Sequence, residues 1–176
     1  MSEYPSEFES DALLSDGRGI HLRPIRPEDA DRERRFFERV GPESAYFRFF
    51  SPKPDLSSGE LRHFTTVDYE DRMAFVAIHG DDMVAVGRFD VLSDDSDSDH
   101  KVAEIALLVE DDFQNCGLGS RLLDQLTVYA RLKGVTGFVA FVLAENGAML
   151  RLLSDTGYKL IRHFDEAAYR IEFSIE

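Results

Sequence analysis

Apolar and polar positions follow two patterns along the chain, and each pattern predicts one type of element. Runs of about four to eight residues in which apolar side chains alternate with polar ones, or fill nearly every position, are typical of strands. Seven runs fit this description: 20–26, 73–79, 83–91, 102–109, 138–143, 157–162 and 168–173. Apolar side chains spaced three and four apart indicate helices. They occur in 27–40, 44–50, 57–64, 118–130 and 146–154.

The order of these elements predicts the fold class. A strand is followed by helices, three strands, a helix, a strand, a helix and two final strands. This alternation is typical of an α/β protein in which helices flank a mixed central sheet, here of about seven strands. No internal repeat is present, so we expect one domain over residues 18–176. Residues 1–17 are polar, acidic and without a pattern, and we expect a flexible acidic tail there.

Length and composition fit a folded globular protein. The chain has 176 residues, of which 43% are hydrophobic and 11% aromatic. Its apolar stretches are well short of the roughly 20 residues that a membrane-spanning helix needs. The N-terminus has neither the basic start nor the apolar run of a secretory signal, and the single cysteine cannot form an internal disulfide. These features agree with a cytoplasmic protein that has no membrane partner.

The formal net charge of −14 argues against a nucleic-acid partner. A duplex-binding protein needs clustered Lys and Arg to contact phosphates. Any anionic ligand would have to be bound by local groups such as the free N–H groups at a helix start, since salt screens the global field beyond about 8 Å. Two interpretations of the acidity stay open: it favours a cationic partner such as a lysine side chain, or it serves solubility in a salty cytoplasm.

The segment Gln114–Ser120 has the features of a phosphate-binding turn. It lies between the apolar run at 102–109 and the amphipathic stretch at 118–130. Gly117 and Gly119 let the backbone approach a ligand closely, and the first N–H groups of the helix are unpaired donors supported by the helix dipole. Pyrophosphate suits such a site. The segment opens at Gln114, and the amides expected to bind are those of Asn115, Cys116, Gly117, Leu118, Gly119 and Ser120.

Two other phosphate-binding motifs do not fit this segment. A P-loop requires G-x-x-x-x-G-K-[ST], and the chain contains no such run. A Rossmann fingerprint requires a third Gly or Ala three positions after Gly119, where Leu122 stands. That fingerprint also normally opens the first strand–helix unit of a chain, whereas several predicted strands precede this segment.

No metal site is expected. The run Asp95-x-Asp97-x-Asp99 imitates the start of an EF-hand loop, but His100 and Ala106 occupy the positions at which that loop needs Gly and Glu. A solvated hairpin loop explains the run better. The five histidines are scattered without the spacing of metal ligands.

Several motifs together resemble the GNAT superfamily of N-acetyltransferases. They are Gln114-x-x-Gly117-x-Gly119, the preceding run Glu104-Ile-Ala-Leu-Leu-Val109, Asn146, and the pair Gly157-Tyr158. Four further segments resemble the acetyltransferase domain of bacterial protein-lysine acetyltransferases. These are 22–29 (LRPIRPED), 42–50 (PESAYFRFF), Asp68-Tyr69 and 144–149 (AENGAM). The likeness covers residues 18 to 174, nearly the whole chain.

The resemblance implies a GNAT-type fold and an enzyme that transfers acetyl from acetyl-CoA, used as co-substrate without a metal, to an amine. The second set of segments implies that the amine is the ε-amine of a protein lysine, with an acyl-CoA synthetase as the expected protein partner. In related proteins this domain is often fused to an acyl-CoA-synthetase-like or cyclic-nucleotide-binding module. A chain of 176 residues has room for neither.

Glu104 is the candidate general base. A lysine ammonium must lose a proton before it can attack, and a carboxylate inside an apolar strand is costly unless it is paired or put to use. Partial burial would make it a stronger base. On the pattern alone, a salt-bridged glutamate at a strand edge is the simpler explanation. The resemblance favours the base, since GNAT lysine acetyltransferases often carry one in this Ala-Glu-Ile context, acting directly or through a water.

The resemblance also implies the remaining contacts. In GNAT proteins the strand that ends here at Val109 diverges from its neighbour and leaves backbone N–H groups free. Counting from Glu104 places the Leu108 N–H at the thioester carbonyl, with Leu108 and Val109 lining the pantetheine arm. Asn146 would bond the pantetheine amides, or would only cap the next helix. Many GNAT enzymes carry a Tyr seven residues after that Asn to protonate the leaving thiolate, and this chain has Leu153 there.

Three functional hypotheses follow. The leading one is an acetyl-CoA-dependent protein-lysine N-acetyltransferase that works by direct transfer in a ternary complex. The second keeps the chemistry but changes the acceptor to a small-molecule amine. The third is a non-catalytic acyl-CoA-binding module that regulates a partner. An acyl-cysteine route through Cys116 is disfavoured, because no histidine lies nearby in sequence to activate the thiol.

Overall fold

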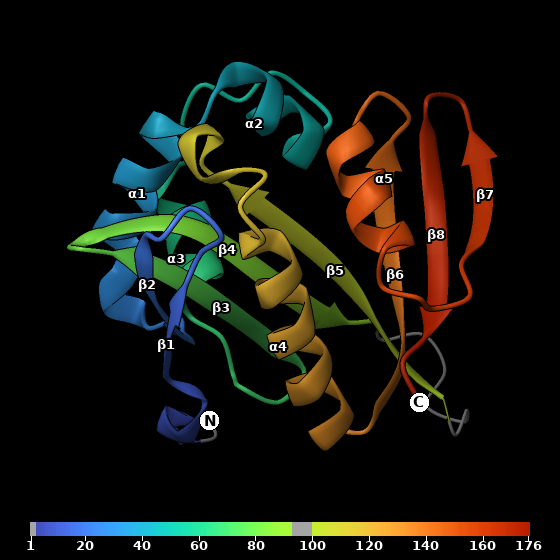
Figure 1. Ribbon diagram of the computed structural model, residues 1–176, viewed down its shortest axis with the longest axis horizontal. Helices are drawn as coiled ribbons and strands as arrows, with labels where there is room; N and C mark the ends of the chain where they lie inside the picture. Colours follow the sequence, from blue (N-terminus) through green and yellow to red (C-terminus); the bar gives the residue numbers. More distant parts are fainter. Residues whose placement is uncertain (1–2, 93–99) are drawn as a thin grey trace.

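One mixed sheet organises the molecule. The computed structural model describes residues 3–92 and 100–176. The strands lie in the order β1-β2-β3-β4-β5-β6-β8-β7, and only β5 and β6 are parallel neighbours (Figure 1). Their bounds are β1 Ser10–Leu13, β2 Gly19–Pro24, β3 Arg72–His79, β4 Asp82–Val91, β5 Lys101–Val109, β6 Val135–Leu143, β7 Ile161–Asp165 and β8 Ala168–Ser174. The expected α/β class and mixed sheet are confirmed, with eight strands in place of about seven.

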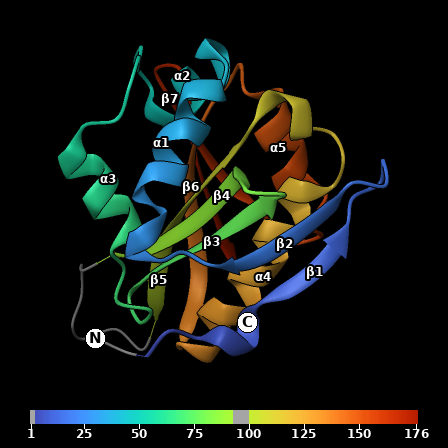
Figure 2. The same ribbon diagram turned by 90° about the vertical axis from the view of Figure 1, so that its left-hand side faces the viewer.

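Five α-helices cover the two faces of the sheet (Figure 2). They are α1 Ala30–Arg39, α2 Pro42–Phe49, α3 Ser58–Thr65, α4 Leu118–Leu132 and α5 Gly147–Ser154. Two adjacent residues of β4 separate the faces. A Cβ added to Gly87 would meet Leu126 of α4 at 3.1 Å, whereas Arg88 reaches the other way and bonds Glu33 of α1 at 2.9 Å. Helices α1 to α3 therefore lie on one face, and α4 and α5 on the other.

Local sequence explains where the helices begin and end. The Ser57 hydroxyl caps α3 by accepting a hydrogen bond from the Glu60 amide, and the Glu60 carboxylate accepts one from the Ser57 amide, which completes a capping box. Helix α2 starts at Pro42, whose fixed φ suits a first helical position. The expected apolar stripe of α4 is buried, with Leu122 and Leu126 at 0% exposure. None of the described helices is both long and apolar enough to cross a bilayer.

The N-terminal residues differ from the flexible tail expected over 1–17. Ser10–Leu13 forms β1, which pairs antiparallel with β2 at the edge of the sheet. Before it, Ser6–Phe8 forms a short 3-10 helix. Phe8 packs edge-on against Tyr129 of α4 at 4.9 Å, and its carbonyl accepts a 2.6 Å bond from Gln125. Sequence pattern missed this segment because a short edge strand buries only one side of few residues.

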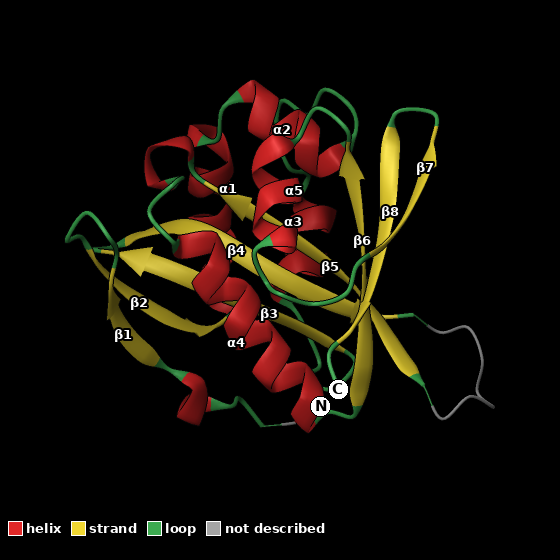
Figure 3. Cartoon of the chain, turned by 45° about the vertical axis from the view of Figure 1, so that its right-hand side comes forward, coloured by secondary structure: helices red, strands yellow, loops and turns green. Residues whose placement is uncertain are grey.

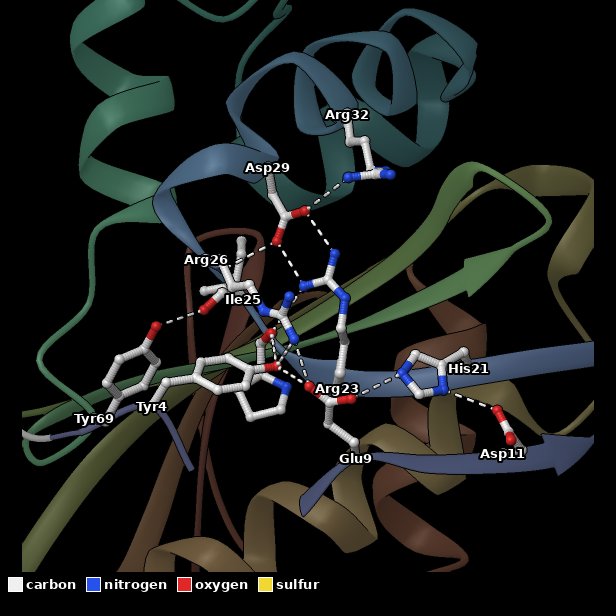
Figure 4. Close-up of polar contacts among 11 residues, drawn as sticks. Tyr4, Glu9, Asp11, His21, Arg23, Ile25, Arg26, Asp29, Arg32 and Tyr69 are labelled. Carbon is white, nitrogen blue, oxygen red and sulfur yellow. Dashed lines mark hydrogen bonds and ion pairs between the residues drawn. The ribbon is translucent and has the colours of Figure 1, made fainter. Parts of the chain in front are cut away.

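Polar contacts fasten this edge to the body of the domain (Figure 4). Tyr4 donates to Glu9 at 2.7 Å, and Arg26 donates to the Tyr4 hydroxyl at 3.0 Å. Beside them, Arg23 and Asp29 form a buried ion pair with two hydrogen bonds of 2.7 and 2.6 Å. Asp29 also accepts from the Arg26 amide, which fixes the turn from β2 into α1. The N-terminal segment is thus held by Arg26, which directly follows β2 and also forms an ion pair with Glu9.

The sequence also predicted a hairpin loop that contains the acidic run at 95–99 and a strand at 157–162. The acidic run at 95–99 lies outside the described residues. The strand expected at 157–162 begins later, at Ile161, because Gly157 follows α5 with φ +79° and the chain must first turn back toward the sheet.

Candidate active site

Strands β5 and β6 separate after their first few residues (Figures 1 and 3). Their parallel pairing runs from Lys101 with Val135 to Glu104 with Val139, and no later residue of the two strands is paired. Strand β6 keeps its other partner, β8, from Gly137 to Leu143. A cleft lined by residues of both strands has a volume of about 1210 Å³. It is larger than the roughly 300–1,000 Å³ of common small-molecule sites, so an extended ligand and a second reactant both fit.

The hydrogen-bond ladder between β4 and β5 decides which backbone groups face this cleft. The Glu110 amide donates to the Val84 carbonyl at 2.9 Å, and the Leu92 amide donates to the Val102 carbonyl at 2.9 Å. The register between these two bonds has no shift. In an antiparallel pair, every second residue turns both its N–H and its C=O toward the partner strand. On β5 these are the even-numbered residues.

This alternation revises the expected role of Leu108. Its N–H and C=O turn toward Val86 of β4, while those of Leu107 and Val109 turn toward the cleft. The Val109 carbonyl accordingly accepts a hydrogen bond of 3.1 Å from the Gln114 side chain instead of from β4. The Leu108 side chain does line the cleft, so it remains a wall residue. Counting residues from Glu104 in the sequence could not show which residues of β5 direct their N–H groups toward β4 and which toward the cleft.

Glu104 stands where β5 and β6 part. It lies on the α1–α3 face of the sheet, directly across the ladder from Asp90, and lines the cleft. Its side chain is exposed, contrary to the partial burial that the apolar run suggested. The alternative of a salt-bridged strand-edge glutamate is not realised either, because no ion pair or hydrogen bond engages its carboxylate within the described part of the chain. An accessible carboxylate without a partner can accept a proton from a group in the cleft.

The segment from Gln114 to Ser120 forms the far end of the cleft. Asn115 and Gly117 have φ values of +56° and +86°, and Gly117 is the N-cap of α4 without any side-chain cap. The first turn of α4 contains no acidic residue. Its first N–H groups are therefore available to an anion, and the helix dipole favours one there. Gly119 allows close packing, since a Cβ there would meet Leu152 at 3.4 Å.

Two residues of this segment have structural partners. The Gln114 amide nitrogen donates to the Val109 carbonyl and to the Ser44 hydroxyl, each at 3.1 Å, so it ties the loop to β5 and to α2. Cys116 is buried, and its thiol donates to the Phe113 carbonyl at 2.7 Å. It does not line the cleft. An acyl-cysteine intermediate therefore gains no support from the geometry.

Helix α5 forms the wall opposite Gln114. Asn146 lines the cleft, and its side-chain oxygen caps α5 by accepting from the Met149 amide at 3.1 Å. That bond leaves the side-chain NH₂ available, so capping and ligand binding are compatible. Leu153 is fully buried, and Tyr158 stacks on Phe173 at 5.5 Å outside the cleft. No tyrosine, histidine or cysteine lines the cleft among the described residues, so the chain provides no obvious side-chain acid for a leaving thiolate.

Sequence reasoning missed the wall contributed by α2. Phe47 and Arg48 of this helix line the cleft together with its C-cap Phe50, and Phe141 of β6 lines it too. Phe50 and Phe141 remain 39% and 46% exposed, so they border the entrance. Burial and the neighbouring Arg88 lower the pKa of Arg48 to about 10. The run at 42–50 carried part of the family resemblance, but its helical spacing alone does not say that these side chains meet β5.

The geometry of the cleft agrees with the family resemblance found in the sequence. A parallel strand pair that splays, with free amides along one edge and an uncapped helix start at its end, is the arrangement implied for GNAT proteins. The model of the Acetyltransferase (GNAT) family matches residues 30–158, more than half of the chain. The chain belongs to the GNAT acetyltransferase family. The resemblance found in the sequence is confirmed, and this GNAT protein is an acetyl-CoA-dependent N-acetyltransferase.

Two curated relatives show how far the GNAT similarity extends. Acetyltransferase PA5475 of Pseudomonas aeruginosa is 32% identical over 149 residues, which cover 82% of this chain and 77% of that protein. Acetyltransferase Pat of Mycolicibacterium smegmatis is 32% identical over 148 residues, which cover 83% of this chain but 43% of that protein. The chain thus spans less than half the length of Pat.

Solved structures confirm the GNAT fold. The crystal structure of the GNAT domain of S. lividans PAT has a TM-score of 0.90 and 37% identity, covering 98% of this chain and 99% of that one. The structure of yncA from Salmonella typhimurium with its cofactor acetyl-CoA has a TM-score of 0.69 at 15% identity, covering 88% and 92% of the two chains. At that identity the second comparison shows the fold alone.

Proposed function

We propose that this enzyme transfers the acetyl group of acetyl-CoA to the ε-amine of a protein lysine by direct attack, with Glu104 as general base. The observation that supports the proposal is the position of Glu104. Its carboxylate is exposed on the wall of the cleft, has no ion-pair partner among the described residues, and lies at the last paired position before β5 and β6 separate. A base at that point faces the region in which both reactants would meet.

Two elements that border the cleft, the start of α4 and the edge of β5, bind acetyl-CoA in this proposal. The free amides at the start of α4 suit the pyrophosphate, with Asn115 to Ser120 as the binding segment. The edge of β5 offers the C=O group of Leu107 and the N–H group of Val109, which can pair with the amides of the pantetheine arm as a neighbouring strand would. The side-chain NH₂ of Asn146 faces the same arm from the opposite wall. The thioester then lies between these contacts and Glu104.

The chemical step needs only these groups. A proton passes from the lysine ammonium to the Glu104 carboxylate, directly or through one water, and the amine nitrogen attacks the thioester carbonyl carbon. As the C–N bond forms, the carbonyl oxygen gains negative charge, which the Leu107 N–H stabilises. The C–S bond then breaks, the attacking nitrogen releases its second proton to solvent to leave the amide, and the CoA thiolate takes up a proton from solvent. Leu107 lies three residues beyond Glu104, about 10 Å along a strand, a gap that a glutamate side chain and one water span.

The acceptor is proposed to be a lysine of a cytoplasmic protein, with an acyl-CoA synthetase as the leading candidate. Three features support this acceptor. The segments at 22–29 and 42–50 resemble those of protein-lysine acetyltransferases, and the similarity to the GNAT domain of S. lividans PAT covers nearly the whole of both chains. The net charge of −14 also favours a cationic surface over an anionic one.

Labelled acetyl-CoA tests the acceptor. The enzyme is incubated with a cell lysate and with a panel of polyamines and aminoglycosides, and Glu104→Gln serves as the reference for non-enzymatic acetylation. The proposal expects label on a small set of protein lysines, identified by mass spectrometry, well above that reference. Turnover of a small amine with protein labelling at the reference rate would assign the enzyme to small-molecule acetylation. Tight acetyl-CoA binding without transfer to any acceptor would make the protein a binding module.

A further inference from the structure

The turn that joins β1 to β2 contacts the loop at 112–117, which leads into α4. Residues 14–18 form this turn, in which the Leu14 amide donates to the Arg18 carbonyl and the Gly17 amide donates to the Leu14 carbonyl, each at 2.9 Å. Hydrogen bonds connect the turn and the end of β1 to the loop and to the first turn of α4. The mechanism above gives these contacts no role, although the loop carries amides that are proposed to bind the pyrophosphate.

Arg18 makes two of the contacts between the turn and the loop. Its guanidinium donates to the Asp112 carbonyl at 2.8 Å and lies over the ring of Phe113, 3.8 Å from the ring centre. Within the turn, the same side chain donates to the Asp16 carboxylate at 2.9 and 2.6 Å. Asp16 thus aligns the guanidinium, and the guanidinium contacts the loop on both a carbonyl and an aromatic face.

Ser15 makes a contact that sets the direction of a loop amide. Its backbone N–H donates to the Cys116 carbonyl at 3.2 Å. The carbonyl of Cys116 and the N–H of Gly117 belong to one planar trans peptide unit, so they point in opposite directions. The bond from Ser15 therefore directs the Gly117 N–H away from the turn. Gly117 lines the cleft, whereas Cys116 does not, which agrees with an N–H on the cleft side.

The conformation of Gly117 explains why an external contact is needed. Its φ is +86°, but a glycine adopts positive and negative φ about equally readily, so the residue itself does not fix the orientation of its peptide unit. A further bond holds the start of α4 in register with the turn, because Arg121 donates to the Leu13 carbonyl at 3.0 Å. The loop is thus held by the hairpin on this side, as well as by the Gln114 side chain.

We propose that the turn at 14–18 is a positioning element for acetyl-CoA, in which Ser15 and Arg18 hold the loop so that the Gly117 N–H is directed at the pyrophosphate. This inference rests on the proposed binding of acetyl-CoA by the Asn115–Ser120 segment. Ser15 and Arg18 do not line the cleft, so they act through the loop and not on the cofactor. A donor that is already held in place binds its ligand without the additional free-energy cost of ordering a loop.

Acetyl-CoA affinity, measured by calorimetry, tests the proposal without an acceptor. Arg18→Met removes the guanidinium and is expected to weaken acetyl-CoA binding roughly three- to tenfold, within the range of substitutions that act on a site through intervening residues. Arg18→Lys keeps a cation that can donate to the Asp112 carbonyl, and should bind nearly as well as wild type. S-acetylpantetheine lacks the pyrophosphate, so an NMR titration with this compound should show equal binding to all three proteins.

His21→Ala is the matched control for a loosened hairpin. His21 of β2 contacts Asp11 at 2.8 Å and Glu9 at 3.4 Å, on the part of the hairpin away from the loop (Figure 4). The variant removes polar contacts of the same sheet edge, so it should lose stability as Arg18→Met does and keep its affinity for acetyl-CoA. An equal loss of affinity in His21→Ala and Arg18→Met would show that Arg18 contributes only to general stability, and would overturn the proposal.

A second variant covers the case in which Arg18→Met does not fold. A synthetic N-terminal peptide with the α-hydroxy acid of Ser15 is joined to the ¹⁵N-labelled remainder of the chain, which removes one N–H and keeps every side chain. The Gly117 amide signal is expected to shift, and acetyl-CoA binding to weaken by a factor similar to that of Arg18→Met. Wild-type affinity in this variant overturns the proposal. The proposed cofactor site fails separately, since wild-type affinity in Gly117→Ala would remove the loop itself as the binding segment.

Discussion

The side-chain amide of Gln114 donates a hydrogen bond of 3.1 Å to the carbonyl oxygen of Val109, and this bond joins the Gln114–Ser120 segment to the end of β5. It exists because β5 has left its parallel neighbour, so the Val109 carbonyl has no strand to bond. The same amide reaches Ser44 of α2. One side chain thus fixes the relative positions of three elements that border the cleft. The amides that follow it are left free for a ligand.

Glu104→Gln is expected to reduce turnover by roughly 100-fold or more at neutral pH, since general bases contribute about 10²- to 10⁴-fold. The affinity for acetyl-CoA should stay within a few-fold of wild type, because the carboxylate lies away from the Gln114–Ser120 segment proposed to bind the phosphates. Glu43→Gln, which neutralises another carboxylate of the same cleft, is the matched control and should keep its turnover. Equal turnover in Glu104→Gln and wild type would exclude Glu104 from the mechanism. Steady-state kinetics and calorimetry give both quantities.

Backbone substitution distinguishes Leu107 from Leu108. Replacing either residue by its α-hydroxy acid through semisynthesis removes one N–H and keeps the side chain. The ester at Leu107 should reduce turnover by roughly 100-fold, the typical cost of one donor to a developing oxyanion. The ester at Leu108 removes a β4–β5 ladder bond instead, so it should cost stability, on the order of 1 kcal/mol, with little effect on turnover. The opposite pattern would restore Leu108 as the donor.

Gly117→Ala should weaken acetyl-CoA binding by roughly tenfold, equivalent to about 1.4 kcal/mol. Gly117 has φ +86°, a conformation that disfavours a side chain, so the substitution shifts the loop that aims the first amides of α4. Gly134→Ala is the matched control, with φ +76° at the other end of α4. Both variants should lose similar stability, and only Gly117→Ala should lose affinity. Equal acetyl-CoA affinity in the two variants would show that this loop does not bind the cofactor.

Asp29→Asn should destabilise the protein on the order of 3 kcal/mol at pH 7, because it leaves Arg23 buried without its counter-ion. Burial opposes ionisation of Asp29, but hydrogen bonds from Arg23 and from the Arg26 amide outweigh it and hold the pKa of Asp29 below its usual value. A lowered folded-state pKa stabilises the protein above the unfolded-state value of about 3.9, and this contribution is lost as the pH falls through the folded-state pKa.

Denaturant unfolding at several pH values measures this contribution. The difference between wild type and Asp29→Asn should be full above about pH 5 and should shrink as the pH falls below about 4. Asp31→Asn removes an exposed carboxylate paired with Arg34 and should change stability little at any pH. A constant difference between wild type and Asp29→Asn across the whole pH range would show that charge is not the source of the stabilisation.

The sequence determined the elements and the family. Helical spacing of Leu122 and Leu126, the capping residues, and the apolar runs are local signals, so the five helices and seven of the eight strands could be predicted. Gly117 and Gly119 marked the turn into α4 for the same reason, since their conformational freedom is a property of the residue itself. The edge strand β1 was missed because a short, mostly exposed strand has no periodic signal.

Tertiary structure decided the chemistry of the cleft. Whether Leu107 or Leu108 presents its amide depends on the pairing of β5 with β4, which no property of either residue reveals. The exposure of Glu104 depends on the separation of β5 from β6, although its own strand is apolar. Arg48 and Glu104 line the same cleft only because α2 packs against β5. Residues far apart in sequence interact through space, and their geometry is set by the whole fold rather than by the local pattern.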